Sequence, residues 1–393
     1  MISWPKDLLK PLRRVTTAGK HIPAFDGLRC LAILWIVVYH LHGSFWVKAP
    51  LGERAPDEGI LHTLLIHGRQ GVPLFFALSG FFLCLPFARQ YVRREGTIDL
   101  KAYYIRRFIR IVPPYWIAVL TIAVIYTVMG RYNTGYLVRH TVASLGFVHT
   151  VALDESNILN FSFWALEILI HFYLIAPLMV FLYFLMGRIA RRTLALLVIV
   201  LLPFFQKAYE LTIAFTLIDF IQYFIAGFVI ADIYVSRKGS RSGYELVPIV
   251  ALPVILFTTY DDSIIERIVY PLMIIGLYLA VLLSAFWERV FNKKGIVAIG
   301  GISYSIFLIH LPIIGFVGTF TMPIPMTGYY YLDFLIQCAI IGPVILILSL
   351  IFYLAAERPF MLIRPHGPVR SVDDVGAGPG NVGTGSDIMN AIK

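Results

Sequence analysis

The chain has 393 residues, of which 59% are hydrophobic and only 14% are charged. Soluble globular domains carry about 25% charged residues, so this composition excludes a soluble protein and indicates one that crosses a membrane several times. The formal net charge is +10 at pH 7. Cys30, Cys84 and Cys338 show no paired spacing, which argues against a disulfide framework and against a cysteine-based metal site.

Apolar runs long enough to cross about 30 Å of hydrocarbon recur along the whole chain. Each is expected to be a helix, because lipid offers no hydrogen-bonding partner to an unpaired backbone group. The expected spans are residues 28–47, 71–88, 111–130, 161–186, 193–209, 211–235, 245–260, 268–287, 297–320 and 331–354. The sequence therefore predicts an all-α, polytopic integral membrane bundle of about ten transmembrane helices.

Lysine and arginine residues gather in alternate connecting segments. With the N-terminus inside the cell, 25 of the 33 fall in cytoplasmic segments and seven in outer segments. The positive-inside rule therefore places both termini in the cytoplasm. Topology also explains the net charge, so no nucleic-acid partner is expected. We expect a basic cytoplasmic segment over 1–24, a transmembrane domain over 25–360 and a disordered cytoplasmic tail over 361–393.

The first span carries an arginine and a histidine eleven positions apart, Arg29 and His40. At about 100° per residue, the two side chains share one helix face, about 16 Å apart along the axis. Ionisable groups in a lipid-spanning helix cost at least about 2.5 kcal/mol each and tend to face the bundle interior. The pair is therefore a site candidate. The alternative is an interfacial arginine and a histidine that bonds to a neighbouring helix.

The second span has Arg69 at its outer end, followed by the small residues Gly71, Ser79 and Gly80. Small residues let two helices approach closely. Helix packing with an interfacial charge is therefore favoured here over a binding role.

The next inner connection contains three arginines, Arg106, Arg107 and Arg110. Arg106 and Arg110 are one helical turn apart, and guanidinium groups bind phosphates through paired donors. The cluster could thus clamp a phosphate. Equally, the positive-inside rule predicts such a cluster beside any span.

The fourth span places Trp164, Glu167 and His171 on one helix face. A carboxylate one or two turns inside lipid is costly, so a functional role is favoured over packing. In the ninth span, Ser303 and His310 are seven positions apart and again share a face. His310 is as easily explained as a hydrogen-bonding residue between helices. Glu357, next to Arg358 after the last span, is consistent with a local ion pair.

Taken in order, these segments resemble the membrane-bound acyltransferase-3 family over about residues 22–360. The resemblance lies in Phe25 to Arg29 with His40, Gly71 to Phe81, Arg106 to Tyr115, Trp164 with Glu167 and Phe172 to Leu174, Ile302 to Ser305 with His310, and Glu357 to Pro359. It implies a multi-pass protein of a bacterial inner or plasma membrane. Such a protein moves an acetyl or other short acyl group from a coenzyme A thioester to a hydroxyl of a cell-envelope or exported glycan, glycolipid or related metabolite. One departure is that Ile168 and Ile170 stand where the family often has a second acid or glutamine, which weakens the assignment of Glu167.

The expected site residues group by role. His40, Glu167 and Arg29 are expected to be catalytic; Arg106, Arg107 and Arg110 to bind acyl-CoA; and Asp26, Arg69, His171, Ser303, Tyr304 and His310 to bind substrate. The resemblance implies no permanently bound cofactor and no metal. The expected partners are the lipid bilayer, acyl-CoA as donor and a carbohydrate or glycolipid acceptor.

The layout suggests a mechanism. His40 would act as general base on the acceptor hydroxyl, with Glu167 orienting it or holding the sugar. The alternative is a transient acyl-histidine that carries the acyl group across. A competing function is a transporter or flippase of a lipid-linked sugar or other envelope precursor, since buried acids and histidines also suit a proton-coupled carrier. Against a carrier, the sequence shows no two related halves, and the arginine cluster would have no role.

Overall fold

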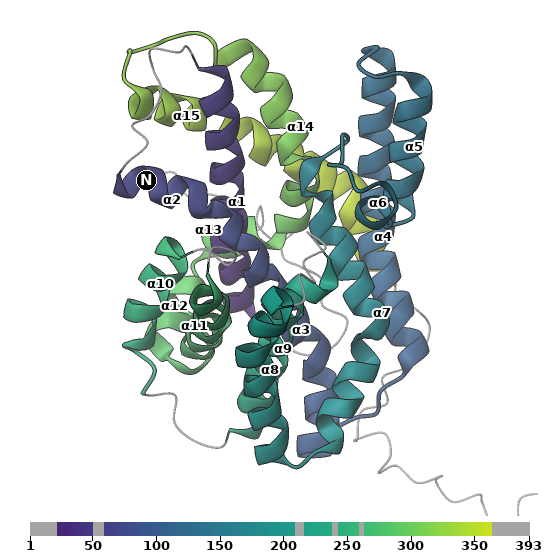
Figure 1. Ribbon diagram of the computed structural model, residues 1–393, viewed down its shortest axis with the longest axis vertical. Helices are drawn as coiled ribbons and strands as arrows, with labels where there is room; N and C mark the ends of the chain where they lie inside the picture. Colours follow the sequence, from purple (N-terminus) through teal and green to yellow (C-terminus); the bar gives the residue numbers. More distant parts are fainter. Residues whose placement is uncertain (1–21, 50–58, 209–215, 238–242, 259–262, 364–393) are drawn as a thin grey trace, which may run out of the picture.

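The computed structural model describes residues 22–49, 59–208, 216–237, 243–258 and 263–363. Every regular element in these residues is a helix, which confirms the all-α class (Figure 1). Most of the basic N-terminal segment expected over 1–24, and nearly all of the tail expected over 361–393, lies outside the described residues.

The helices follow one another with short connections. In chain order they are α1 (Pro23–Lys48), α2 (Ile60–Ile66), α3 (Gly71–Ala88), α4 (Leu100–Val128), α5 (Thr134–Leu145), α6 (His149–Leu153), α7 (Trp164–Leu185), α8 (Arg188–Ala208), α9 (Leu217–Ser236), α10 (Val247–Phe257), α11 (Ile264–Leu283), α12 (Ala285–Phe291), α13 (Lys294–Gly301), α14 (Ser303–Thr321), α15 (Tyr330–Phe352) and α16 (Arg358–Leu362). A single turn, η3 (His67–Gln70), joins α2 to α3, and another, η6 (Tyr353–Glu357), joins α15 to α16.

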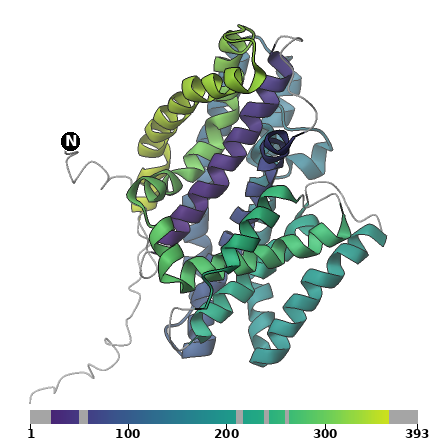
Figure 2. The same ribbon diagram turned by 90° about the vertical axis from the view of Figure 1, so that its left-hand side faces the viewer.

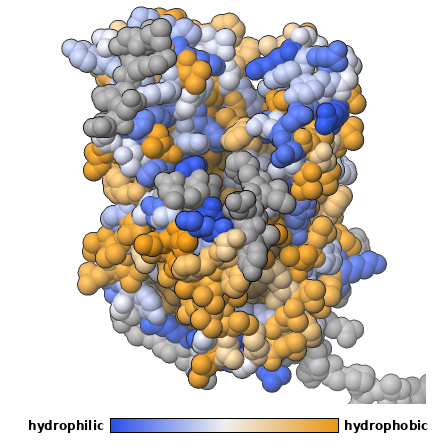
Figure 3. Space-filling model, viewed as in Figure 1, coloured by the Kyte–Doolittle hydropathy of each residue, from blue (hydrophilic) through white to orange (hydrophobic). Residues whose placement is uncertain are grey.

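Nine helical segments in the described part of the chain are long and apolar enough to cross a membrane. The protein is therefore a multi-pass membrane protein. Figure 2 shows α1 as a long, tilted helix. Hydrophobic residues dominate the lower half of the face in Figure 3, and polar residues gather toward its upper edge.

Three expected spans differ from the helices found. The segment 245–260 contains α10, whose 11 residues reach only about 16 Å at 1.5 Å per residue. The segment 268–287 is divided at Ser284, whose hydroxyl accepts a hydrogen bond from the amide of Trp287 and so starts α12. The segment 297–320 is divided at Ile302, between α13 and α14. Apolar content alone does not reveal such breaks, and the number of crossings stays a prediction.

Helix α3 lies against α9 at the centre of the bundle (Figure 1). A β-carbon on Gly80 would collide with the carbonyl oxygen of Phe224, and one on Gly227 with that of Ala77. The two glycines therefore allow the backbones to approach closely. On another side of α3, Tyr278 of α11 donates a hydrogen bond to the carbonyl of Leu74 at 2.7 Å.

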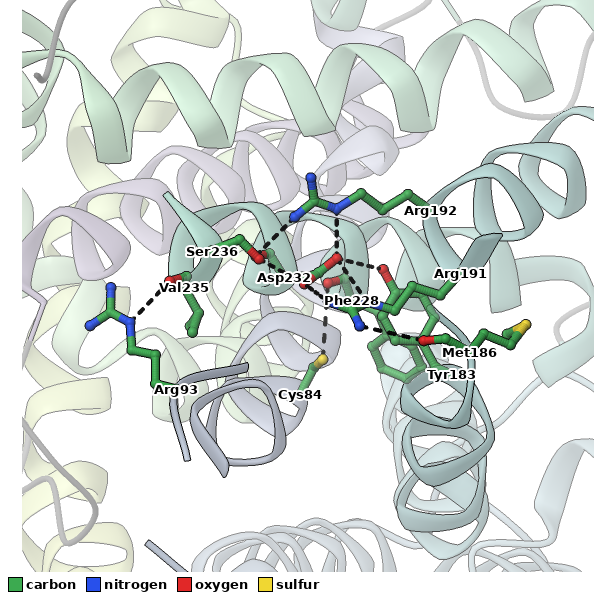
Figure 4. A network of polar contacts seen from close by, with 10 residues as sticks. All are labelled: Cys84, Arg93, Tyr183, Met186, Arg191, Arg192, Phe228, Asp232, Val235 and Ser236. Carbon is green, nitrogen blue, oxygen red and sulfur yellow. Dashed lines mark hydrogen bonds and ion pairs between the residues drawn. The ribbon is translucent and has the colours of Figure 1, made fainter. Parts of the chain in front are cut away.

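A charge cluster joins α8 to α9 (Figure 4). Arg191 donates to both carboxylate oxygens of Asp232, from Nη2 at 2.6 Å and from Nε at 3.1 Å. Arg192 donates from Nε at 2.6 Å, and Ser236 donates its hydroxyl at 3.1 Å. Asp232 is completely buried, so its charge is balanced by these donors rather than by water.

Candidate active site

A cavity of about 270 Å³ lies between α1, α3, α4, α7 and α14. We call the end of the bundle where α3 ends and α4 begins the inner end, because the positive-inside rule predicts that this end faces the cytoplasm. Five arginines line the cavity: Arg29, Arg89, Arg106, Arg107 and Arg110. Two acids, Asp26 and Glu357, also line it. The cationic side chains outnumber the acids, so the cavity is suited to an anion.

Helix α1 contributes Asp26 and Arg29 to the cavity. The two side chains are one helical turn apart and form an ion pair. The guanidinium of Arg29 also lies over the ring of Phe82, with its carbon 4.8 Å from the ring centre. Both contacts hold the arginine head in place at the cavity, where the sequence expected it to face.

The arginine cluster is helical rather than part of a loop. Helix α4 begins at Leu100 because the Asp99 carboxylate accepts a hydrogen bond from the amide of Ala102, which caps the helix. Arg107 donates to the carbonyl of Phe82 at 3.4 Å and lies over the ring of Tyr173. The Nη2 atom of Arg110 is buried and has no hydrogen-bond partner among the described residues. It is therefore available to a ligand.

Helix α14 contributes Ser303 and Tyr304 to the cavity. The Tyr304 hydroxyl donates to the carbonyl of Ile111 at 2.7 Å, which joins α14 to α4. Glu357 reaches the cavity from η6 and accepts a 2.6 Å hydrogen bond from Ser305. The sequence suggested only a local ion pair for Glu357. Its pairing with Ser305, 52 positions away, could not be foreseen from its neighbours.

The two histidines of the expected site lie beside each other. The ring centres of His40 and His310 are 5.2 Å apart. The Nδ1 atom of His310 lies 3.1 Å and 2.9 Å from the carbonyls of Ile306 and Phe307. Carbonyls only accept, so these hydrogen bonds require a proton on Nδ1, and in the neutral ring Nε2 then keeps a lone pair. This Nε2 atom is buried, without a hydrogen-bond partner among the described residues.

Phe307 connects this histidine pair to the cavity. It lines the cavity, and its ring centre is 5.9 Å from that of His310. His310 follows Phe307 by three positions, about 4.5 Å along the axis of α14. His310 therefore lies about one helical turn beyond Phe307, the last residue of α14 that lines the cavity, and His40 lies beside it.

Glu167 and His171 bind a different part of the chain. Glu167 accepts hydrogen bonds from the amide and the hydroxyl of Thr150 in α6, at 3.1 Å and 3.2 Å. The ring of His171 lies 2.9 Å from the carbonyl of Phe147, just before α6. Neither residue lines the cavity. They share a helix face, as expected, but that face holds α6 in place.

Arg69 lies in η3, before α3, and does not line the cavity. The structure thus brings Asp26, Arg29, Arg106, Arg107, Arg110, Ser303 and Tyr304 together at one cavity, with His40 and His310 adjacent to it. It places Arg69, Glu167 and His171 away from the cavity lining.

A second pair of histidines lies outside the spans, between α5 and α6. The Nδ1 atom of His140 is 2.7 Å from Nε2 of His149, and Nε2 of His140 is 3.3 Å from the Glu155 carboxylate. Burial, and then the neighbouring His140, lowers the pKa of His149 from 6.5 to about 4. Burial also lowers the pKa of His140. No three His, Cys, Asp or Glu side chains in the described ranges form a group that could hold a metal ion.

Known proteins match this chain along most of its length. A family model described as an acyltransferase domain, the acyltransferase-3 model, matches residues 22–354. The peptidoglycan O-acetyltransferase OatA of Listeria monocytogenes is 31% identical over 185 residues, which cover 44% of this chain and 26% of that protein. The O-acetyltransferase OatA of Staphylococcus aureus is 23% identical over 359 residues, which cover 83% of this chain and 56% of that protein. The chain thus spans about half the length of these relatives, or less. No solved structure matches it.

Proposed function

The chain belongs to the acyltransferase-3 family, and on that premise we propose that it transfers an acetyl or other short acyl group from a coenzyme A thioester to a hydroxyl of a cell-envelope or exported glycan, glycolipid or related metabolite. The observation that carries the proposal is the cavity lined by five arginines and two acids. The competing function, a transporter or flippase of a lipid-linked sugar or other envelope precursor, predicts no transfer of an acyl group from a coenzyme A thioester.

The inner end of the cavity suits the donor. Coenzyme A carries a pyrophosphate and a further phosphate, and arginine binds phosphate oxygens through paired, charge-assisted hydrogen bonds. Arg106, Arg107 and Arg110 are presented by the first turns of α4, near the side on which the donor is made. Arg110 has a buried nitrogen with no protein partner among the described residues, and a phosphate oxygen would satisfy it.

The relatives suggest the class of acceptor. One is named a peptidoglycan O-acetyltransferase and another an O-acetyltransferase. For this chain we propose a hydroxyl of an envelope glycan or of an exported glycolipid, approaching His40 from the outer side.

In the proposed reaction, His40 removes the proton of the acceptor hydroxyl, and the hydroxyl oxygen attacks the carbonyl carbon of the thioester at the same time. The carbon–sulfur bond breaks, and the coenzyme A thiolate leaves and receives the proton. The ring of His310 lies beside that of His40, and its unprotonated Nε2 can accept a hydrogen bond from the working imidazole. His310 would thus orient His40, a role the sequence suggested for Glu167.

A covalent route is the alternative within this function. There, a nitrogen of His40 takes the acyl group from sulfur, the thiolate leaves, and the acceptor oxygen then displaces the imidazole. Incubation of the protein with acyl-labelled coenzyme A thioester in the absence of acceptor separates the routes. Label retained on the wild-type protein and absent from His40→Ala indicates the covalent route.

The test of the function is acyl transfer itself. Mass spectra of envelope glycans and exported metabolites from cells with and without the protein should differ by acyl substituents. His40→Ala should abolish the difference while the protein still accumulates in the membrane. Normal acylation by a normally expressed His40→Ala protein would refute the role of His40. An unchanged acyl content in cells lacking the protein, together with no binding of coenzyme A, would refute the function.

A further inference from the structure

The residues around the cavity change character along the membrane normal. Helices α4 and α7 run in opposite directions, since Tyr103 bonds to the carbonyl of Tyr173 and the ring of Tyr115 lies against that of Phe163. The arginines of α4, which lie between Tyr103 and Tyr115, are therefore level with the part of α7 between Phe163 and Tyr173. Asn160, which precedes α7, lies level with the second turn of α14, because its side chain donates to the carbonyl of Leu308 at 2.9 Å.

The outer end of the cavity is apolar. Its lining residues there are Val72, Phe75, Phe76, Ala165, Leu166 and Phe307. Arg106 and Arg107 lie inward of these side chains, so a donor whose phosphates bind these two arginines can extend its thioester toward the apolar end. The acyl group, as the apolar end of the donor, gains most by burial among these side chains.

Phe307 lines the cavity and also lies against one member of the histidine pair. Phe307 is 7% exposed, and its ring is in contact with that of His310, which neighbours His40. A thioester carbon within reach of His40 therefore has the Phe307 ring close by. The remaining carbons of the acyl chain have to fit in the space that this ring leaves.

We propose that Phe307 sets the length of the acyl group that the enzyme accepts, by closing the outer end of the donor cavity next to His40 and His310. The proposal rests on the proposed function, because it takes the ligand of the cavity to be a coenzyme A thioester. A packed protein interior deforms little. While the Phe307 ring stays in place, each methylene added to the acyl chain therefore lowers the affinity for the donor.

The experiment measures donor binding and needs no acceptor. Purified full-length protein in lipid nanodiscs is titrated calorimetrically with coenzyme A, acetyl-CoA, butanoyl-CoA and hexanoyl-CoA. For the wild type we expect affinity to fall from acetyl to hexanoyl. In Phe307→Ala, hexanoyl-CoA should gain roughly tenfold or more relative to acetyl-CoA, the scale of methylene discrimination in a pocket. Phe307→Leu, which disturbs packing less, should shift the ratio in the same direction.

Leu85→Ala is the matched control. Leu85 lines the same cavity from a later turn of α3, nearer the inner end. Its truncation should leave the order of chain lengths unchanged. An unchanged ratio in Phe307→Ala and Phe307→Leu, or equal wild-type affinity for acetyl-CoA and hexanoyl-CoA, would overturn the role of Phe307 alone. Failure of every coenzyme A compound to bind the wild type would instead overturn the proposed function.

Discussion

At the scale of single residues, His310 is the side chain whose environment most constrains its chemistry. It is fully buried, and two backbone carbonyls fix the proton on Nδ1. The free Nε2 lone pair then lies in the neighbourhood of the His40 ring. A histidine that only joined two helices would use both nitrogens for bonds between them. His310 instead bonds to its own helix through one nitrogen and keeps the other unused.

The variant His310→Asn distinguishes the roles of the two ring nitrogens of His310. In His310→Asn, the amide nitrogen can still donate to the carbonyls of Ile306 and Phe307, but the atom corresponding to Nε2 is gone. We expect kcat to fall by up to about 10⁴, the scale seen when the group that orients a catalytic histidine is replaced, with little change in KM for the donor or in thermal stability. Steady-state kinetics of acyl transfer measures this, and wild-type kcat in the variant would contradict the orienting role.

At the scale of elements, α8 and α9 depend on one buried carboxylate. Replacing Asp232 with Asn removes the charge opposite Arg191 and Arg192 and leaves two guanidinium groups without a counter-ion (Figure 4). Breaking a buried ion pair by removing one partner costs about 3–5 kcal/mol. We therefore expect a clear fall in the melting temperature of the detergent-solubilised protein.

The control for this substitution is Ser236→Ala, which removes a neutral donor to the same carboxylate. Its effect should be about 1 kcal/mol. Equal melting temperatures for the two variants would show that the charge cluster does not stabilise the pairing of α8 with α9.

We expect the stability of the segment from α5 to α6 to depend on the pH of the medium at the outer face of the membrane. His149 is neutral in the folded protein because its pKa is lowered to about 4 by burial and by His140, whereas an unfolded histidine titrates near 6.5. Between these values the unfolded segment binds a proton that the folded segment does not. Stability is therefore complete above pH 6.5 and falls as the pH decreases toward 4.

Hydrogen exchange of residues 134–153 at pH 7.5 and pH 5 measures this effect. Exchange should be faster at pH 5, after correction for the intrinsic rate. The charged groups that face the rings of His140 and His149 include Arg139 and Glu155. Of these two, only Glu155 favours the protonated form of the histidines. His149→Gln should reduce the pH dependence, and an undiminished dependence in that variant would assign it to another group.

At the scale of the whole molecule, the short helix α10 decides the number of crossings. The side chain of Gln206 near the end of α8 donates to the carbonyl of Ile218 in α9 and accepts from Arg267 in α11. Helices α9 and α11 therefore begin at the same end of the bundle. The chain between the end of α9 and the start of α11, which contains α10, has to return across the molecule.

This return favours an even number of crossings, with both termini on the same side. Reporter domains fused to the N-terminus and to the C-terminus should both be active only in the cytoplasm. A reporter placed after Phe257 should behave as an outer one. Opposite locations for the two termini would show that α10 does not complete a crossing.

The family and the membrane class were readable from the sequence. The lengths of the apolar runs and the absence of backbone partners in lipid determine helical spans, and six short motifs in order pointed to the family that the matching model shows. Helical periodicity also gave correct shared faces, such as that of Glu167 and His171. These are local properties, set by 3.6 residues per turn.

Which faces meet was decided only by the tertiary structure. Glu167 faces α6, while Glu357 faces Ser305, 52 positions earlier in the chain. Lipid is as apolar as leucine, so helices in a membrane are paired by close backbone approach and by a few polar contacts rather than by apolar burial. Such pairings involve residues far apart in the chain. For this reason the sequence could nominate Arg29, Arg106 and Ser303 separately, whereas the packing of five helices placed them at one cavity.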